Sequence, residues 1–126
     1  MRPLIWICAA GALGTGTRYA IAVWAAGRLG ASWPYGTFIV NVAGCFAATA
    51  VMHAALALGW PPVVRTAVMI GFLGGLTTYS TFTYETVQLI ENGARMAALV
   101  NVVLTTVATL VAAVAGLITA RALVGP

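Results

Sequence analysis

The chain has 126 residues, of which 62% are hydrophobic and only 6% are charged, and its net charge is +4. Roughly a quarter of the residues in a soluble domain are charged, so this composition excludes a soluble enzyme and predicts an integral membrane protein. One bilayer crossing takes about 20 apolar residues, so the length allows four crossings with short loops. The six arginines are scattered rather than clustered, so no nucleic-acid partner is expected.

The first predicted membrane helix covers about residues 3–24. Because Arg2 precedes a short apolar stretch, the same residues also have the features of a signal peptide. We favour a membrane helix, since the apolar character continues to Trp24 without the boundary of a mature domain. The stretch GRLGASWPYG then forms a connection, and residues 33–35 are expected to make a turn at the membrane interface.

The second predicted helix covers about residues 36–58 and ends before Pro61 and Pro62, which cannot continue it. Its middle carries Asn41, a polar amide in the apolar run TFIVNVAGCF. Inside a membrane such an amide either joins two helices by hydrogen bonding or lines a polar path. For a single residue the joining role is the more common one, and both interpretations stay open here.

The third predicted helix, about residues 63–90, is longer than one crossing requires, so it must tilt or be interrupted. The stretch GFLGGLTTYSTF at 71–82 is the predicted interruption, because Gly71, Gly74 and Gly75 lower the cost of a break. Carbonyls released by a break are hard oxygen ligands that bind a cation such as Na⁺ without any side-chain charge. The alternative is a glycine-rich helix that packs closely against a neighbour.

Hydroxyl and aromatic side chains follow these glycines. Tyr79 and Phe82 lie one helical turn apart, among the hydroxyls of Thr77, Thr78, Ser80, Thr81 and Thr83. An aromatic ring is positive at its edge, so two rings presented edge-on can replace part of the water shell of a small anion. An anion that is costly to dehydrate needs several donors in series, which the hydroxyls supply. The stretch therefore favours passage of an anion.

The fourth predicted helix, about residues 95–121, follows a short turn at 91–93. Asn101, Thr105 and Thr109 recur every four residues, so they share one face of the helix and suit a polar track. Threonines in membrane helices often bond their own backbone instead, which is the alternative explanation.

Arg18 and Glu85 are the charged residues expected inside membrane helices, which makes them candidates for function. They could equally form a pair at the interface or extend to water near helix ends. With four crossings, the arginines divide three against two or three between the two sides of the membrane. Insertion in both orientations would allow an antiparallel homodimer, whereas a decision by one arginine would give a single topology.

Three motifs, GTGTRY, GTFIVNVAGCF and GFLGGLTTYSTF, resemble those of the fluoride channels of the Fluc, or CrcB-like, family. Any one motif is a weak signal, but their combination covers nearly the whole chain at the expected spacing. The resemblance implies an all-α membrane protein of four helices, with the third broken near its centre, in a dual-topology antiparallel homodimer. It implies passive fluoride export through two pores per dimer across the inner membrane of a bacterium, and not an enzyme.

The resemblance also assigns residues. A structural Na⁺ at the dimer centre would be held by backbone carbonyls of Gly74 and Thr77 from both subunits. The fluoride pore would be lined by Asn41, Tyr79, Ser80, Thr81, Phe82, Thr105 and Thr109. Arg18 and Glu85 match polar positions of the family. Tyr79 departs from the family, which commonly has Phe there, and its extra hydroxyl could add a donor or narrow the pore.

Two other functions stay open at this point. A small four-helix multidrug or cation exporter has a similar length and also uses dual topology. A proton-coupled carrier of that kind needs a carboxylate in its first helix, and residues 3–24 contain none. The other alternative is a non-conducting partner subunit of a heterodimeric channel.

Overall fold

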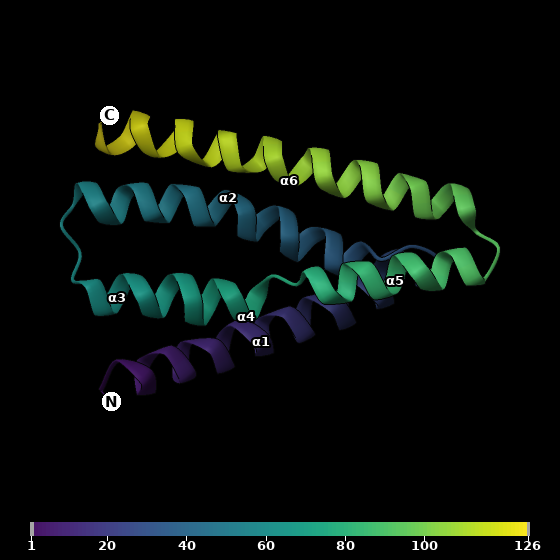
Figure 1. Ribbon diagram of the computed structural model, residues 1–126, viewed down its shortest axis with the longest axis horizontal. Helices are drawn as coiled ribbons and strands as arrows, with labels where there is room; N and C mark the ends of the chain where they lie inside the picture. Colours follow the sequence, from purple (N-terminus) through teal and green to yellow (C-terminus); the bar gives the residue numbers. More distant parts are fainter. Residues whose placement is uncertain (1, 126) are drawn as a thin grey trace.

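The computed structural model describes residues 2–125, which are helical apart from short connections. These helices form four rods, of which the third is a series of shorter elements. Figure 1 shows the rods side by side, with both chain termini at the same end. The first, second and fourth rods are α1 (Arg2–Leu29), α2 (Tyr35–Ala57) and α6 (Arg95–Val124). The third rod is a series of α3 (Pro62–Thr66), the π-helix η1 (Ala67–Leu73), α4 (Gly74–Leu76) and α5 (Tyr79–Glu91). The predicted all-α class is confirmed for these residues.

Two helices run further than their apolar patterns predict. α1 ends at Leu29 rather than near residue 24, and α6 ends at Val124 rather than near residue 121. Each is followed by a glycine with positive φ, namely Gly30 at 87° and Gly125 at 91°. Residues with side chains rarely adopt this conformation, so glycine is the usual residue after a helix end. These glycines, and not a loss of apolar residues, therefore end the two helices.

The surfaces of α2 and α6 are too apolar for a chain surrounded by water. Both helices are long and apolar enough to cross a membrane, with mean hydropathies of 1.7 and 2.3 over their most apolar windows. Only 22% and 11% of those windows are buried within the chain, so neither is the core helix of a soluble fold. The exposed side of α6 carries large aliphatic side chains, including Leu99, Val103, Leu110, Val114 and Ile118. This surface suits lipid or another membrane helix.

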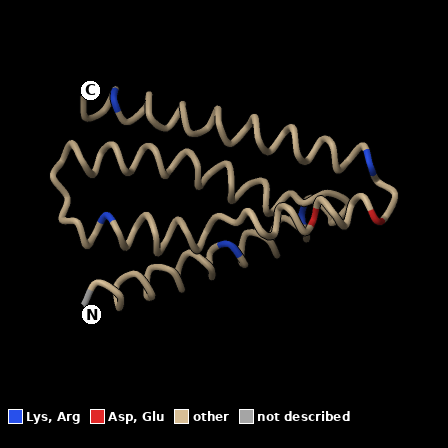
Figure 2. The backbone as a smooth tube through the Cα atoms, viewed as in Figure 1, with Lys and Arg blue, Asp and Glu red and all other residues tan. Residues whose placement is uncertain are grey.

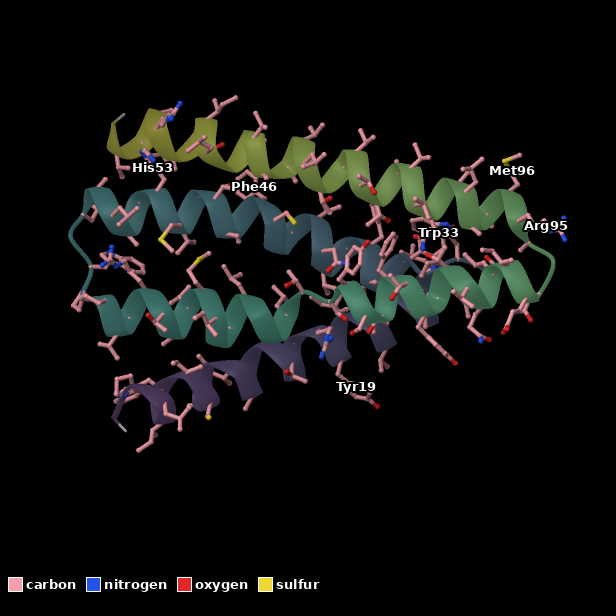
Figure 3. The ribbon with its side chains drawn as sticks, viewed as in Figure 1. Tyr19, Trp33, Phe46, His53, Arg95 and Met96 are labelled. Atoms are coloured by element: carbon pink, nitrogen blue, oxygen red, sulfur yellow. The ribbon has the colours of Figure 1, made fainter. Side chains whose placement is uncertain are left out.

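α2 packs along α6, and small residues bring the two backbones together. A Cβ on Gly116 would overlap the backbone of Phe46, and Thr49 Oγ1 donates across to a carbonyl of α6 at 2.6 Å. Near the chain termini, His53 Nε2 donates to Gly125 O at 2.8 Å (Figure 3). Close backbones and interhelical hydrogen bonds thus hold this pair, as is usual where lipid removes the hydrophobic drive between helices.

The glycines of the third rod pack against α1. A Cβ on Gly71 would come within 2.6 Å of Ile7 O, and one on Gly75 within 2.6 Å of Gly11 O. Gly74 points elsewhere, and a Cβ there would meet nothing nearer than 3.8 Å within the chain. The close-packing interpretation of these glycines therefore holds for Gly71 and Gly75, and Gly74 is left on the open side of the molecule.

The third rod changes neighbours at its break, which lies about midway along the bundle (Figure 1). Before the break, η1 and α4 pack on α1, whereas α5 after the break packs on α6. The element that leads to the break, η1, is a seven-residue π-helix. Such segments are rare and are frequent at functional sites. The π-helix before the break therefore indicates that the break and the side chains around it are a candidate functional site.

Charged residues lie mainly toward the two ends of the bundle (Figure 2). Arg65 in α3 and Arg121 in the last turn of α6 belong to the end that carries the chain termini. Arg28 in the last turn of α1 and Arg95 at the start of α6 belong to the opposite end. The folded chain thus has positive charge at both ends and no strong excess at either.

Gly75→Ala is expected to destabilise the folded chain by about 1–3 kcal/mol, because its methyl group would press into the α1 backbone at Gly11 and Thr15. Thermal unfolding of the purified protein in detergent, followed by circular dichroism, measures the effect. Gly27→Ala is the matched control, since Gly27 is also a helical glycine and a Cβ there would meet nothing within 4 Å. Equal melting temperatures for Gly75→Ala and the wild type would contradict this packing.

Candidate functional site

The break consists of two extended threonines between α4 and α5. Thr77 has φ −84° and ψ 155°, and Thr78 has φ −154° and ψ 116°. The backbone N–H and the hydroxyl of Thr77 both donate to Leu73 O, at 3.0 and 2.8 Å, and so close the preceding helix. Thr78 Oγ1 accepts from Thr81 N at 3.1 Å and caps α5. Each threonine thus serves one helix end.

Asn41 of α2 holds the break by two hydrogen bonds. Its Oδ1 accepts from Thr78 N at 2.8 Å, and its Nδ2 donates to Thr78 O at 3.0 Å. Both residues are buried, with 8% and 7% of their surfaces exposed. Backbone groups that leave a helix away from water must find a partner, and this amide supplies both. An amide nitrogen carries two donor hydrogens, so one N–H of Asn41 stays available for a ligand.

These contacts release two carbonyls from their helical partners. In a continuous α-helix Thr78 N would donate to Gly74 O, and Thr81 N would donate to Thr77 O. Thr78 N donates to Asn41 instead, and Thr81 N donates to the hydroxyl of Thr78. The Gly74 and Thr77 carbonyls are the sodium ligands predicted from sequence, and they have the oxygen-donor character that a hard cation prefers. One chain offers two such oxygens, fewer than a cation shell needs.

Three of the predicted hydroxyls form a cluster around Thr78. Its Oγ1 donates to Thr81 Oγ1 at 3.0 Å and lies 3.2 Å from Ser80 Oγ. Ser80 is exposed and Thr81 is half-buried, so the cluster reaches from the interior to the surface of the chain. Thr83 does not join it, because its hydroxyl donates to Ser80 O at 2.9 Å on its own helix.

The rings of Tyr79 and Phe82 are brought together at the start of α5. Their centroids are 5.4 Å apart and their planes are tilted by 47°. Phe82 is buried, with 7% of its surface exposed, whereas Tyr79 is 78% exposed. The pair therefore has one ring inside the chain and one on its outer face.

A second amide joins α5 to α6. Asn101 is 1% exposed, and its Nδ2 donates to Thr86 Oγ1 at 2.9 Å while its Oδ1 accepts from Thr105 Oγ1 at 3.2 Å. Thr86 in turn donates to Phe82 O at 2.7 Å. The predicted pore residue Thr105 is thus connected to the helix that carries the aromatic pair.

Thr109 does not belong to this network. Its hydroxyl lies 2.8 Å from Thr105 O and 3.0 Å from Thr106 O, on its own helix. The alternative explanation from the sequence, in which a membrane threonine bonds its own backbone, describes Thr109 in this structure.

Arg18 and Glu85 line one groove beside the break. This inner groove, of about 270 Å³, is also lined by Thr37, Thr78 and Thr81. An outer groove of similar size, about 270 Å³, opens at the end of the bundle between the 30–36 connection and α5. Thr37 and Glu85 line both grooves, so the two meet at these residues. The two grooves therefore adjoin between the end of the bundle and the threonines of the break.

Residues 5–117 match the family described as CrcB-like protein, Camphor Resistance (CrcB). The chain belongs to this family. The match covers the break, Asn41 and most of α6, so every site residue described above lies inside it.

Several full-length relatives are named "Fluoride-specific ion channel FluC". One from Citrifermentans bemidjiense is 44% identical over 98% of this chain and 100% of its own length. One from Geobacter sp. strain M21 has the same identity and coverage, and one from Anaeromyxobacter sp. strain K is 42% identical over 99% of this chain and 100% of its own length. These names confirm that the chain is a membrane protein of a channel family and not an enzyme.

Sequence reasoning missed several members of the site. Thr78 was expected only as a hydroxyl donor, whereas its backbone is the partner of Asn41. Thr86 was not expected at the site at all. Asn101 was recognised on the same face as Thr105, and the buried amide was itself the signal that it needed partners.

Asn41→Ala is expected to lower the stability of the fold by several kcal/mol, since it leaves the buried N–H and C=O of Thr78 unpaired at about 1–3 kcal/mol each. The loss is measured as a fall in the thermal unfolding temperature of the purified protein. Asn92→Ala, in the exposed turn after α5, is the control and should leave it unchanged. An unchanged temperature for Asn41→Ala would show that the break does not depend on this amide.

Proposed function

We propose that this chain is a fluoride-selective channel that lets fluoride leave the cell passively. The observation that carries the proposal is the donor set around the break, in a chain that matches channels named fluoride-specific over its whole length. The spare N–H of Asn41, the hydroxyls of Ser80 and Thr81 and the edges of two rings all favour a small anion. The chain would work as a multi-pass protein of the bacterial plasma membrane.

Selectivity follows from the cost of removing water from fluoride. A small anion is costly to dehydrate, so it passes only where several donors replace its water in turn. Thr105 and Thr109 are proposed to continue this series along α6, although their donor hydrogens bond within the chain at rest. The proposed donors, namely Asn41, Ser80, Thr81 and the two rings, are all neutral. The inner groove beside them is lined by Arg18 together with Glu85, so no net positive charge traps anions there.

We propose that the functional unit is an antiparallel homodimer with two pores. The even distribution of arginines supports insertion in both orientations, and the exposed Tyr79 and Gly74 supply a face that a second copy would cover. Two copies would bring four carbonyls, from Gly74 and Thr77 of each chain, to one place. A sodium ion held there would bind carbonyl oxygens of both chains and so hold the chains together. Its proposed role is structural.

The alternative exporter is disfavoured by the composition of α1. A proton-coupled multidrug carrier needs a carboxylate in its first crossing, and Arg2–Leu29 contains no Asp or Glu. A non-conducting subunit of a heterodimer has the same sequence requirements as a channel, so flux from the single chain decides that question.

Liposomes that contain only this chain should release fluoride, with little chloride release and with no dependence on a proton gradient. The reason is that the proposed path has neutral donors and no coupled carrier step. A fluoride electrode and a chloride electrode measure the two effluxes, and liposomes without protein give the background. Equal chloride efflux, or efflux that requires a proton gradient, would refute the channel; no fluoride efflux would favour the non-conducting subunit.

Tyr79→Phe should keep most of the fluoride flux, because the ring edge remains and only one exposed hydroxyl is lost. Tyr79→Ile should reduce flux at least tenfold, because an aliphatic side chain has no positive edge. Both variants are compared with the wild type in the same liposome assay, with dimer content measured by cross-linking. If the isoleucine variant conducts as well as the phenylalanine variant, the ring-edge explanation fails.

Tagged chain termini should be found on both sides of the membrane in one preparation, as dual insertion requires. Accessibility of a cysteine tag to an impermeant reagent, before and after permeabilisation, measures the division. A variant with two added arginines after α6 should shift all termini to one side and lose flux. Termini on a single side in the wild type would be incompatible with the antiparallel dimer.

A further inference from the structure

Two buried side-chain atoms have no hydrogen-bond partner among the residues that the structure describes, and both belong to residues that line the outer groove. They are the indole Nε1 of Trp33 and Oε2 of Glu85. A buried polar atom without a partner is costly, and each one in a folded protein calls for an explanation such as a water or an ion. Two such atoms in one groove point to a ligand that occupies it.

The Trp33 ring is held in place by its neighbours. It packs edge to face on Tyr35, with centroids 5.0 Å apart, and against Phe38 at 5.4 Å. All three lie in the connection before α2 or in its first turn. Figure 3 shows Trp33 toward the end of the bundle that carries Arg95. A ring fixed in this way presents its N–H in one direction, as a preorganised donor does.

The chemistry of the groove selects a small hydrogen-bond acceptor. Indole nitrogen only donates. Glu85 is the one charged residue of the groove, and its other polar lining residues are Ser32, Tyr35, Thr37, Gln88 and Asn92. No basic residue lines the groove, so an anion held there is bound weakly. Weak binding is what an entry site requires, because the ion must also leave.

We propose that Trp33 is the outermost anion contact of the pore, where partly hydrated fluoride accepts a hydrogen bond from the indole N–H. One water that stays on the ion donates to Glu85 Oε2, so the carboxylate is satisfied without touching the anion. The proposal rests on the proposed function. In this proposal, fluoride first exchanges a water for a protein donor at Trp33. It then reaches the inner groove, which adjoins the outer groove at Thr37 and Glu85.

Nuclear magnetic resonance of the indole N–H groups tests this site directly. The chain has four tryptophans, so the ¹⁵N-labelled protein in detergent gives few indole signals, which single Trp→Phe variants assign. Sodium fluoride should move the Trp33 signal and saturate, while sodium chloride at equal ionic strength should move it little. A Trp33 signal that ignores fluoride would mean that water alone fills the groove, and an equal response to chloride would also overturn the proposal.

Fluoride efflux from liposomes gives the second readout. Trp33→Phe keeps an aromatic ring and loses the donor, and it should raise the fluoride concentration for half-maximal efflux roughly three- to tenfold. Trp24→Phe is the matched control, because Trp24 is exposed near the same end and does not line the groove. If the wild type does not conduct, the proposed function fails; if it conducts and Trp33→Phe matches it, this inference fails.

Discussion

The double hydrogen bond between Asn41 and the Thr78 backbone is the contact on which the site depends. A helix broken at membrane depth exposes backbone groups that lipid cannot satisfy. Asn41 takes up both the N–H and the C=O of Thr78, so two extended residues persist between α4 and α5. The same contact removes the Thr78 N–H from Gly74 O, so one amide both holds the break and leaves a carbonyl free.

The position of the break could be predicted from the sequence, whereas the sequence left two reasons for its glycines open. The run at 71–82 combines residues that weaken a helix with hydroxyls that need partners, and the break falls inside it at Thr77 and Thr78. Gly71 and Gly75 are spaced one helical turn apart because α1 crosses there, as their contacts with Ile7 O and Gly11 O indicate. The close approach of two helices is a feature of tertiary structure, so the sequence of one segment does not show which helix it will contact.

The sequence also could not identify which residues on neighbouring helices would form hydrogen bonds with each other. A buried amide needs hydrogen-bond partners. Nothing in the sequence around Asn101, however, identifies its acceptor as Thr86, which lies 15 residues away on α5. The sequence predicts Trp33 in an interfacial turn, and the structure places it in the connection before α2, beside Tyr35. Only the fold shows that the Trp33 N–H has no partner among the described residues and that α5 residues line the same groove. Residue type thus predicts the need for a contact, and the fold decides which contact is made.

The single chain carries exposed site residues on its outer face, which the proposed second copy would cover. Phe82 is buried while Tyr79 is 78% exposed, and Gly74, whose carbonyl has lost its helical donor, is also on the exposed side. Lipid would be a poor neighbour for that carbonyl and for the hydroxyls beside it, so a protein surface is the better cover. In an antiparallel pair of chains, the two breaks lie at the same depth in the membrane only if each break is midway along its bundle. The break lies there (Figure 1), which is the geometric condition that an antiparallel pair requires.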